Sequence, residues 1–159
     1  MNANVEIKRA DKKNLHTLTV LTKTFFPYVN FSSDEINRRL TSNEIAYFVA
    51  LHDGATVGFV DYEIIRSSPE QPRCRCKLIG LAVLPEFRQK GIARKLIERV
   101  LQETQLEKCN SIFLLVAEDN AIAIKLYTSL GFSSRGSADK VLGGKKILIM
   151  EKFLGSNSI

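Results

Sequence analysis

The sequence predicts one α/β domain in which helices flank a central mixed sheet. Strand-like and helix-like segments interchange along the chain in the order β-α-α-β-β-β-α-β-α-β-β. The 159 residues are enough for one domain with a sizeable core and too few for two ordinary ones. Hydrophobic residues make up 45% of the chain and charged residues 25%, which excludes a disordered or fibrous protein. We expect the domain to span 1-154 and a flexible tail to follow at 155-159.

A strand and two helices are predicted first. Residues 5–7 alternate between apolar and polar, as in a short half-buried strand. Asp11 is placed to cap a helix that Pro27 ends. Ser32 and Glu35, three residues apart, form a capping box for a second, shorter helix.

Three strands are predicted next. Two β-rich runs, 46–51 and 56–65, are joined at Asp53-Gly54, which is a hairpin signal. The segment 67–73 contains two prolines and is predicted to be a loop. The third strand, 74–84, ends at a proline.

The second half alternates helices and strands. An amphipathic helix is predicted over 91–106, and the apolar run 111–117 is typical of a strand covered on both faces. A helix over 120–130 and two closing strands, 132–137 and 146–152, complete the prediction. Three side chains are expected to lie together on one side of the later helix: Ile122, Leu126 and Leu130.

Charge and cysteine content narrow the function classes. The net charge of +6 and the pI near 9.3 suggest an anionic partner, whether nucleic acid, membrane surface or a phosphate-bearing small molecule. The excess is concentrated in two windows, 66–77 and 86–99. No apolar run approaches the roughly 20 residues that span a bilayer, and no signal peptide is evident, so we expect a cytoplasmic protein. Three cysteines without ligand spacing predict neither a disulfide scaffold nor a metal site.

The segment from Leu81 to Arg94 carries the chemistry. A strand stops at Pro85, a basic turn follows, and a helix opens at Gly91. A helix N-terminus presents unpaired N–H groups and partial positive charge, and glycine lets an anion approach the backbone closely. Spacing alone leaves two interpretations open: a pyrophosphate site, or an ordinary loop before a surface helix.

Two motifs in this sequence resemble those of the GNAT superfamily of acyl-CoA-dependent N-acetyltransferases. Arg88-Gln89-Lys90-Gly91-Ile92-Ala93 is similar to the family's Arg/Gln-x-x-Gly-x-Gly/Ala loop. Asn120-Ala121-Ile122-Ala123-Ile124-Lys125-Leu126-Tyr127, followed by Leu130-Gly131-Phe132, is similar to its second signature. The signature around Tyr127 also resembles the branch that acetylates protein N-termini. The order of predicted elements fits the GNAT fold over nearly the whole chain.

The resemblance implies an acetyl-CoA site and an acid. The pantetheine arm would lie between the strand ending at Val83 and the strand ending near Ala117, where a backbone N–H would polarise the thioester carbonyl. Tyr127 would protonate the leaving thiolate, whereas the pattern alone favours a packed core tyrosine. No metal is implied. The implied cofactor-binding residues are Leu81, Ala82, Val83, Arg88, Gln89, Lys90, Gly91, Ile92, Ala93, Arg94 and Asn120.

The general base is not identified by the motifs. The positions where many relatives carry a glutamate hold Lys77, Gly80 and Leu115. Three nearby carboxylates are either ordinary exposed surface groups or bases acting through water: Asp61, Glu63 and Glu118. An α-amine, with a pKa near 8, needs less help than a lysine amine, which tilts the prediction toward a protein N-terminal acceptor.

We therefore expect an acetyl-CoA-dependent N-acetyltransferase acting on a primary amine, by direct transfer because no cysteine sits where an acyl intermediate would form. An acetyltransferase for a small-molecule amine (polyamine or amino sugar) and a non-catalytic acyl-CoA-binding module stay open as alternatives. We expect no nucleic-acid or membrane partner. Monomer and homodimer are both left open.

Overall fold

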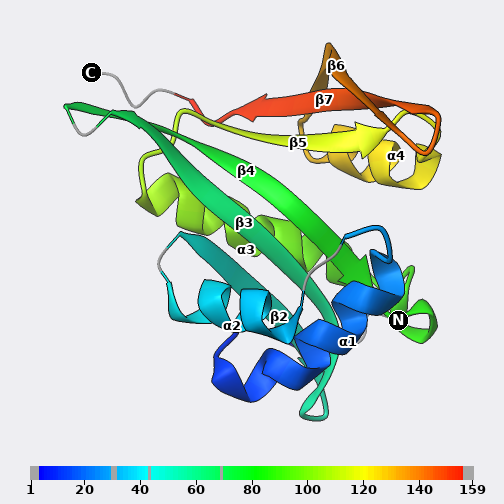
Figure 1. Ribbon diagram of the computed structural model, residues 1–159. Helices are drawn as coiled ribbons and strands as arrows, with labels where there is room; N and C mark the ends of the chain where they lie inside the picture. Colours follow the sequence, from blue (N-terminus) through cyan, green and yellow to red (C-terminus); the bar gives the residue numbers. More distant parts are fainter. Residues whose placement is uncertain (1–3, 30–31, 43, 69, 156–159) are drawn as a thin grey trace. The chain divides into compact units, whose positions relative to one another are not determined.

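The computed structural model has the predicted mixed α/β fold (Figure 1). It describes residues 4–29, 32–42, 44–68 and 70–155. Its contacts gather in two compact units, which we describe separately: unit 1 comprises Met1–Glu63 and Gly80–Gln102, and unit 2 comprises Ile64–Ile79 and Glu103–Ile159. Within the described ranges, no helix is long and apolar enough to cross a membrane.

Seven strands form one mixed sheet. In order of hydrogen bonding they are β1 (Glu6–Arg9), β2 (Ile45–His52), β3 (Ala55–Ser68), β4 (Gln71–Val83), β5 (Ser111–Ala117), β7 (Lys145–Phe153) and β6 (Ser133–Leu142). β4 and β5 run parallel, with a register from Arg75↔Ser111 to Leu78↔Leu114. The helices are α1 (Leu15–Phe25), α2 (Ser33–Thr41), α3 (Ile92–Leu106) and α4 (Ala121–Ser129), and short 3₁₀ turns occupy Lys12–Asn14 and Pro85–Phe87.

The caps and the first hairpin of unit 1 follow from the sequence signals. The Asp11 side chain caps the 3₁₀ turn that leads into α1. The Ser32 hydroxyl accepts the Glu35 N–H at the start of α2, whereas the Glu35 carboxylate binds Arg38 and Arg39, so only half of the predicted capping box is present. Asp53 and Gly54 both have positive φ, 50° and 80°, as a type I′ hairpin turn requires. The predicted hairpin is therefore confirmed.

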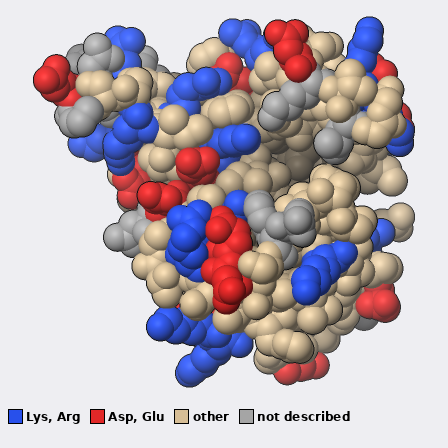
Figure 2. Space-filling view, viewed as in Figure 1, with Lys and Arg blue, Asp and Glu red and all other residues tan. Residues whose placement is uncertain are grey.

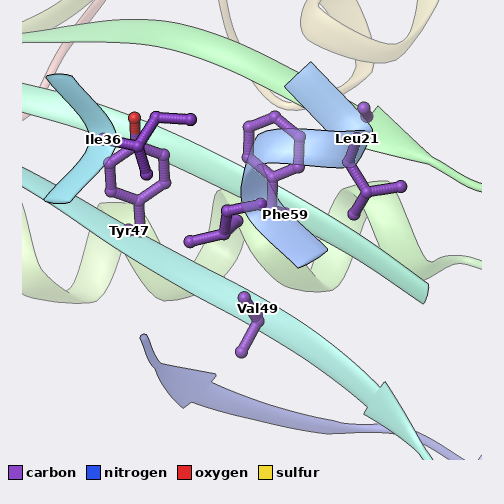
Figure 3. Packing of buried hydrophobic residues seen from close by; sticks show 7 residues of the cluster. Leu21, Ile36, Tyr47, Val49 and Phe59 are labelled. Carbon is purple, nitrogen blue, oxygen red and sulfur yellow. The ribbon is translucent and has the colours of Figure 1, made fainter. Parts of the chain in front are cut away.

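The core of unit 1 lies between the sheet and helices α1 and α2. Leu21 and Ile36 from these helices meet Tyr47, Val49 and Phe59 from β2 and β3 (Figure 3). α3 lies on the other face, where the Arg99 guanidinium stands 4.7 Å from the centre of the Phe48 ring (Figure 1). Alternate residues of β2 thus serve opposite faces of the sheet, since side chains along a strand point alternately to its two sides.

In unit 2, β7 pairs with the whole length of β5, and β6 joins β7 in a hairpin through Gly143 and Gly144. β5 is buried or half-buried throughout, as its apolar run predicts. β6 and β7 are longer than the predicted strands because the hairpin extends pairing to Leu142 and Lys145.

One expectation about the elements is wrong. The segment 67–73 is not a loop, because β3 continues to Ser68 and β4 begins at Gln71; a proline is tolerated near a strand start, where its missing N–H breaks little pairing. Ile122 shares the helical spacing of Leu126 and Leu130, but the residue is 87% exposed at the start of α4. Apart from Gly155, the predicted flexible tail lies outside the described residues.

Candidate functional site

In unit 1, the segment from β4 to α3 makes a tight, basic turn. After the 3₁₀ turn Pro85–Phe87, Gln89 and Gly91 both adopt positive φ, 62° and 80°. The Gly91 carbonyl accepts the Lys95 N–H at 3.1 Å, so the helical hydrogen bonds of α3 begin here. A Cβ built on Gly91 would meet nothing within 4 Å. The helix therefore starts beside open space, with its first N–H groups unused by its own ladder.

Two basic side chains of this turn, Arg88 and Lys90, make defined contacts within unit 1. The Arg88 Nε donates to the Val83 carbonyl at 2.9 Å, and its guanidinium stands 5.6 Å from the centre of the Phe25 ring. The Lys90 ammonium stands 5.6 Å from the Phe87 ring. Arg88 thus binds the end of β4 to the turn and places its charge near the start of α3.

The structure keeps the predicted cofactor residues of unit 1 in one continuous stretch of β4, turn and helix. Leu81 is half-buried, and Ala82 and Val83 are each 8% exposed. A Cβ built on Gly58 would lie 2.9 Å from the Ala82 carbonyl, so β3 approaches this strand end closely. The remaining residues of the prediction, Asn120 and Tyr127, belong to unit 2.

Asn120 caps α4. Its Oδ1 accepts the Ala123 N–H at 3.2 Å, which supplies one partner for the unpaired donors at this helix start. The Asn of the second motif therefore has a structural role that is visible without any ligand.

Tyr127 is buried, with only 7% of its surface exposed. Its ring packs against Phe132, with 5.7 Å between ring centres, and the Phe132 N–H donates to the Tyr127 carbonyl. The Gly-Phe end of the second motif thus packs on its tyrosine. Burial raises the pKa of Tyr127 to about 12. Its phenol is therefore protonated at neutral pH.

The Tyr127 hydroxyl has no hydrogen-bond partner among the described residues. Every fully buried side-chain oxygen of those residues does have a partner, so the Tyr127 oxygen is not fully buried. Its oxygen therefore reaches the molecular surface while its ring is packed. The ring of Tyr127 thus packs in the core while its hydroxyl stays accessible, so the packing role and the acid role are compatible.

Unit 1 contains a buried polar network that the sequence does not single out. Arg39 on α2 donates to Glu35 at 3.2 Å, to the Tyr47 hydroxyl at 3.2 Å and to Asp61 at 3.3 Å. Asp61 also accepts the Gly80 N–H at 2.9 Å. The available signals were an arginine three residues after the buried Ile36 on α2, and an aspartate that follows Val57 and Phe59 at alternate positions of β3.

The three carboxylates considered as bases have different surroundings. Asp61 is only 4% exposed, so its expectation as an ordinary surface group is wrong; the partners in α2 and β4 enclose it. Glu63 is half-buried, and Glu118 is exposed. Burial raises the pKa of Asp61 to about 7, although Arg39 and the Gly80 N–H lower it.

The charge excess of 66–77 has internal partners in unit 2. Arg66 pairs with Glu107 at 2.8 Å. Arg75 pairs with Glu151 at 2.8 Å and lies 4.2 Å from the centre of the Phe113 ring. On the face that Figure 2 shows, basic side chains are scattered among acidic ones instead of forming a continuous stripe. Among the described residues, no group of three or more His, Cys, Asp and Glu could hold a metal ion.

Comparison with known proteins identifies the family. The family model of the "Acetyltransferase (GNAT) family" matches residues 15–132. The aminoglycoside N(6')-acetyltransferase type 1 of Salmonella typhimurium is 31% identical over 58% of this chain and 66% of its own length. The [ribosomal protein bS18]-alanine N-acetyltransferase of the same organism is 39% identical over 35% of this chain and 38% of its own length.

The fold comparison agrees. Arabidopsis thaliana NAA60 in complex with a bisubstrate analogue superposes with a TM-score of 0.82, covering 96% of this chain and 100% of that one, at 18% identity. NAA60 has also been solved with acetyl-CoA. The matched segments span at most about two thirds of these two Salmonella enzymes. The chain belongs to the GNAT family of acetyltransferases.

Proposed function

We propose that this chain transfers acetyl from acetyl-CoA directly to a primary amine, giving the N-acetyl product and CoA with a free thiol. The observation that carries the proposal is the start of α3: an open helix N-terminus at Gly91, flanked by Arg88 and Lys90, at the end of a strand in the family's first motif. Such a terminus suits a pyrophosphate, because its N–H groups and its partial charge both favour an anion.

The cofactor would use this strand, turn and helix together with the capping asparagine of α4. The amides of 88–94 would hold the pyrophosphate, and the end of β4 would hold the pantetheine arm through backbone groups. The Val83 carbonyl already accepts from Arg88, which leaves the N–H groups of Leu81 and Val83 as the stronger candidates for the acyl end. The proposed set is Leu81, Ala82, Val83, Arg88, Gln89, Lys90, Gly91, Ile92, Ala93, Arg94 and Asn120.

Two groups would act on the reacting atoms. The N–H of Leu81 would stabilise the oxyanion that develops as the amine attacks the thioester carbonyl. Tyr127 would donate its proton toward the departing sulfur. Its pKa of about 12 keeps that proton in place at neutral pH and lies above the ordinary thiol value of about 8.5, so the phenol would stabilise the departing thiolate by donating a hydrogen bond. The proton that the CoA thiol finally carries balances the one that the amine loses on acetylation.

The three cysteines support direct transfer over an acyl-enzyme. Cys74, Cys76 and Cys109 are all buried, and burial raises the pKa of Cys109 to about 12, so its thiolate is scarce at neutral pH. A covalent intermediate would need an exposed, ionisable thiol.

We favour a protein or peptide N-terminal α-amine as the acceptor. An α-amine is partly neutral near pH 8 and demands little from a base, which suits a chain whose motif positions lack a glutamate. The likeness to the [ribosomal protein bS18]-alanine N-acetyltransferase agrees with this choice, while the likeness to an aminoglycoside acetyltransferase keeps a small-molecule amine as the second candidate.

An acceptor panel tests the proposal. Acetyl-CoA consumption is measured with peptides that have free N-termini, with lysine peptides whose N-termini are blocked, and with polyamines and amino sugars. We expect turnover with free N-termini and none with the blocked peptides. Turnover confined to polyamines or amino sugars would replace the peptide acceptor by a small molecule. Calorimetric binding of acetyl-CoA without any turnover would make the chain a non-catalytic binding module.

A further inference from the structure

Asp61 lies at the centre of the buried polar network in unit 1. One carboxylate oxygen, Oδ1, accepts the Gly80 N–H from β4 at 2.9 Å. The other, Oδ2, accepts from the Arg39 guanidinium of α2 at 3.3 Å. Arg39 is itself fastened by Glu35 and by the Tyr47 hydroxyl. The carboxylate therefore joins α2 to the backbone of β4 and is held at both of its oxygens.

Gly80 makes room for this contact. A Cβ built on Gly80 would lie 2.7 Å from Asp61 Oδ1 and 3.6 Å from the Phe26 ring of α1. Any larger residue at position 80 would displace the carboxylate. The two residues are thus a matched pair: the glycine admits the carboxylate, and the carboxylate holds the glycine's N–H.

The location of the pair gives it a consequence for the site. Gly80 directly precedes Leu81, and glycine is the residue with the greatest backbone freedom. An unrestrained glycine at this point would let the peptide between residues 80 and 81 rotate, and with it the direction of the Leu81 N–H. A preorganised donor stabilises an oxyanion far better than one that must be oriented during the reaction.

We propose that Asp61 is a positioning residue, which fixes the backbone at Gly80 and so aims the Leu81 N–H at the thioester carbonyl. The inference rests on the proposed function, because it assigns a purpose to a backbone donor of that site. Asp61 does not touch the substrate; it acts through β4. Its enclosure by Arg39 and Gly80 also removes it from the residues that could bind a water as the general base.

The charged and titratable groups facing Asp61 are Glu35 and Arg39 from α2 and Tyr47 from β2. Burial sets the pKa of Asp61 near 7, while Arg38 and Arg39 lower the pKa of Glu35 to about 2. Asp61 is therefore the member of the network that changes charge between pH 6 and 8. Its titration should alter the chemical shift of the Gly80 amide, which donates to it, independently of catalysis.

Steady-state kinetics on three variants test the proposal. Asp61→Ala removes the acceptor, and we expect kcat to fall about tenfold or more while KM for acetyl-CoA changes less than about threefold. Asp61→Asn keeps a carbonyl oxygen for the Gly80 N–H, and at pH 8 it should restore kcat to within about threefold of the parent. Asp34→Asn, an exposed aspartate of α2, is the matched control and should leave kcat unchanged.

A merely structural role predicts a different result. Asp61→Ala would then lower stability but leave kcat per folded molecule unchanged, which overturns the proposal. If Asp61→Ala does not fold, Asp61→Leu is used instead, because it fills the buried volume without offering an acceptor to the Gly80 N–H; an unchanged kcat in Asp61→Leu is equally contrary. In ¹⁵N-labelled protein the Gly80 amide shift should titrate with a midpoint near pH 7 in the parent and not in Asp61→Asn. A parent protein without acetyl transfer refutes the proposed function, whereas an active parent with an active Asp61→Ala refutes only this inference.

Discussion

Replacing Tyr127 by phenylalanine removes one oxygen and keeps the ring that packs on Phe132. The lost hydroxyl has no hydrogen-bond partner among the described residues, so the roughly 1 kcal/mol of a typical hydrogen bond is not at stake. The free energy of unfolding should therefore change by less than about 0.5 kcal/mol, which corresponds to about 2 °C in Tm for a chain of this size. The same oxygen is the proposed proton donor, and its loss should lower kcat by about 100-fold.

The assay measures thiol release from acetyl-CoA and urea unfolding on the same preparations. KM for acetyl-CoA should change by less than about threefold, since the hydroxyl acts on the departing sulfur and not on the ground state. Because the pKa of Tyr127 is about 12, ionisation of this phenol should cause no loss of kcat up to pH 10 in the parent. An unchanged kcat in Tyr127→Phe would refute the acid role, and a parallel loss of stability and turnover would reduce Tyr127 to a packing residue.

Tyr62→Phe is the matched control. Tyr62 is equally buried, at 3% exposed, and its ring stacks on Phe48, but its hydroxyl accepts from the Arg9 guanidinium at 3.3 Å. Its substitution should cost about 1 kcal/mol of stability and leave kcat unchanged. The two variants thus separate an oxygen that serves stability from one that serves turnover.

Three further predictions concern backbone and charge, each measured by urea unfolding. Gly91 and Gln89 both have positive φ, which glycine adopts more easily than other residues. Gly91→Ala should therefore lower the free energy of unfolding by about 0.5–1 kcal/mol, and Gln89→Gly should raise it by a similar amount. Effects of the same sign would contradict this prediction. Burial raises the pKa of Asp61 in the folded parent, so the parent loses stability between pH 3.8 and about 7, whereas Asp61→Asn does not titrate. The free energy of unfolding of Asp61→Asn relative to the parent should therefore rise by up to about 4 kcal/mol over this range and then level off. A difference independent of pH would contradict this prediction. Glu151→Gln should cost about 2 kcal/mol at pH 7. That cost should fade as pH falls below 4.5, since Ser111 and Arg75 lower the pKa of Glu151; a constant cost would count against the ion pair.

Features that depend on a few neighbouring residues could be predicted from the sequence. The Asp53-Gly54 hairpin, the Asp11 cap and the glycine at the start of α3 each depend on local backbone geometry, and all are present. A local signal failed at 67–73, where two prolines indicated a loop but strand pairing extends to either side of the turn. Pairing between strands is a long-range interaction that outweighs local propensity.

Features that depend on distant contacts could not be predicted. The helical stripe of Ile122 with Leu126 describes spacing on α4, but which part of that stripe is covered depends on elements elsewhere in the chain, and Ile122 is left exposed. The Asp61–Arg39 contact joins residues 22 positions apart, and no periodic pattern encodes it. The role of Arg75 likewise became visible only through its partner Glu151, which is 76 residues away.

The central claim is direct acetyl transfer from acetyl-CoA to an amine, and mass spectrometry with thiol counting tests it most directly. The protein is mixed with acetyl-CoA, first without and then with a peptide bearing a free N-terminus. We predict that without peptide the protein mass stays unchanged and no thiol is released. With peptide, each acetylated α-amine should appear together with one CoA thiol. A protein that gains an acetyl group before the amine is added, or peptide that stays unmodified while CoA binding is intact, would contradict the claim.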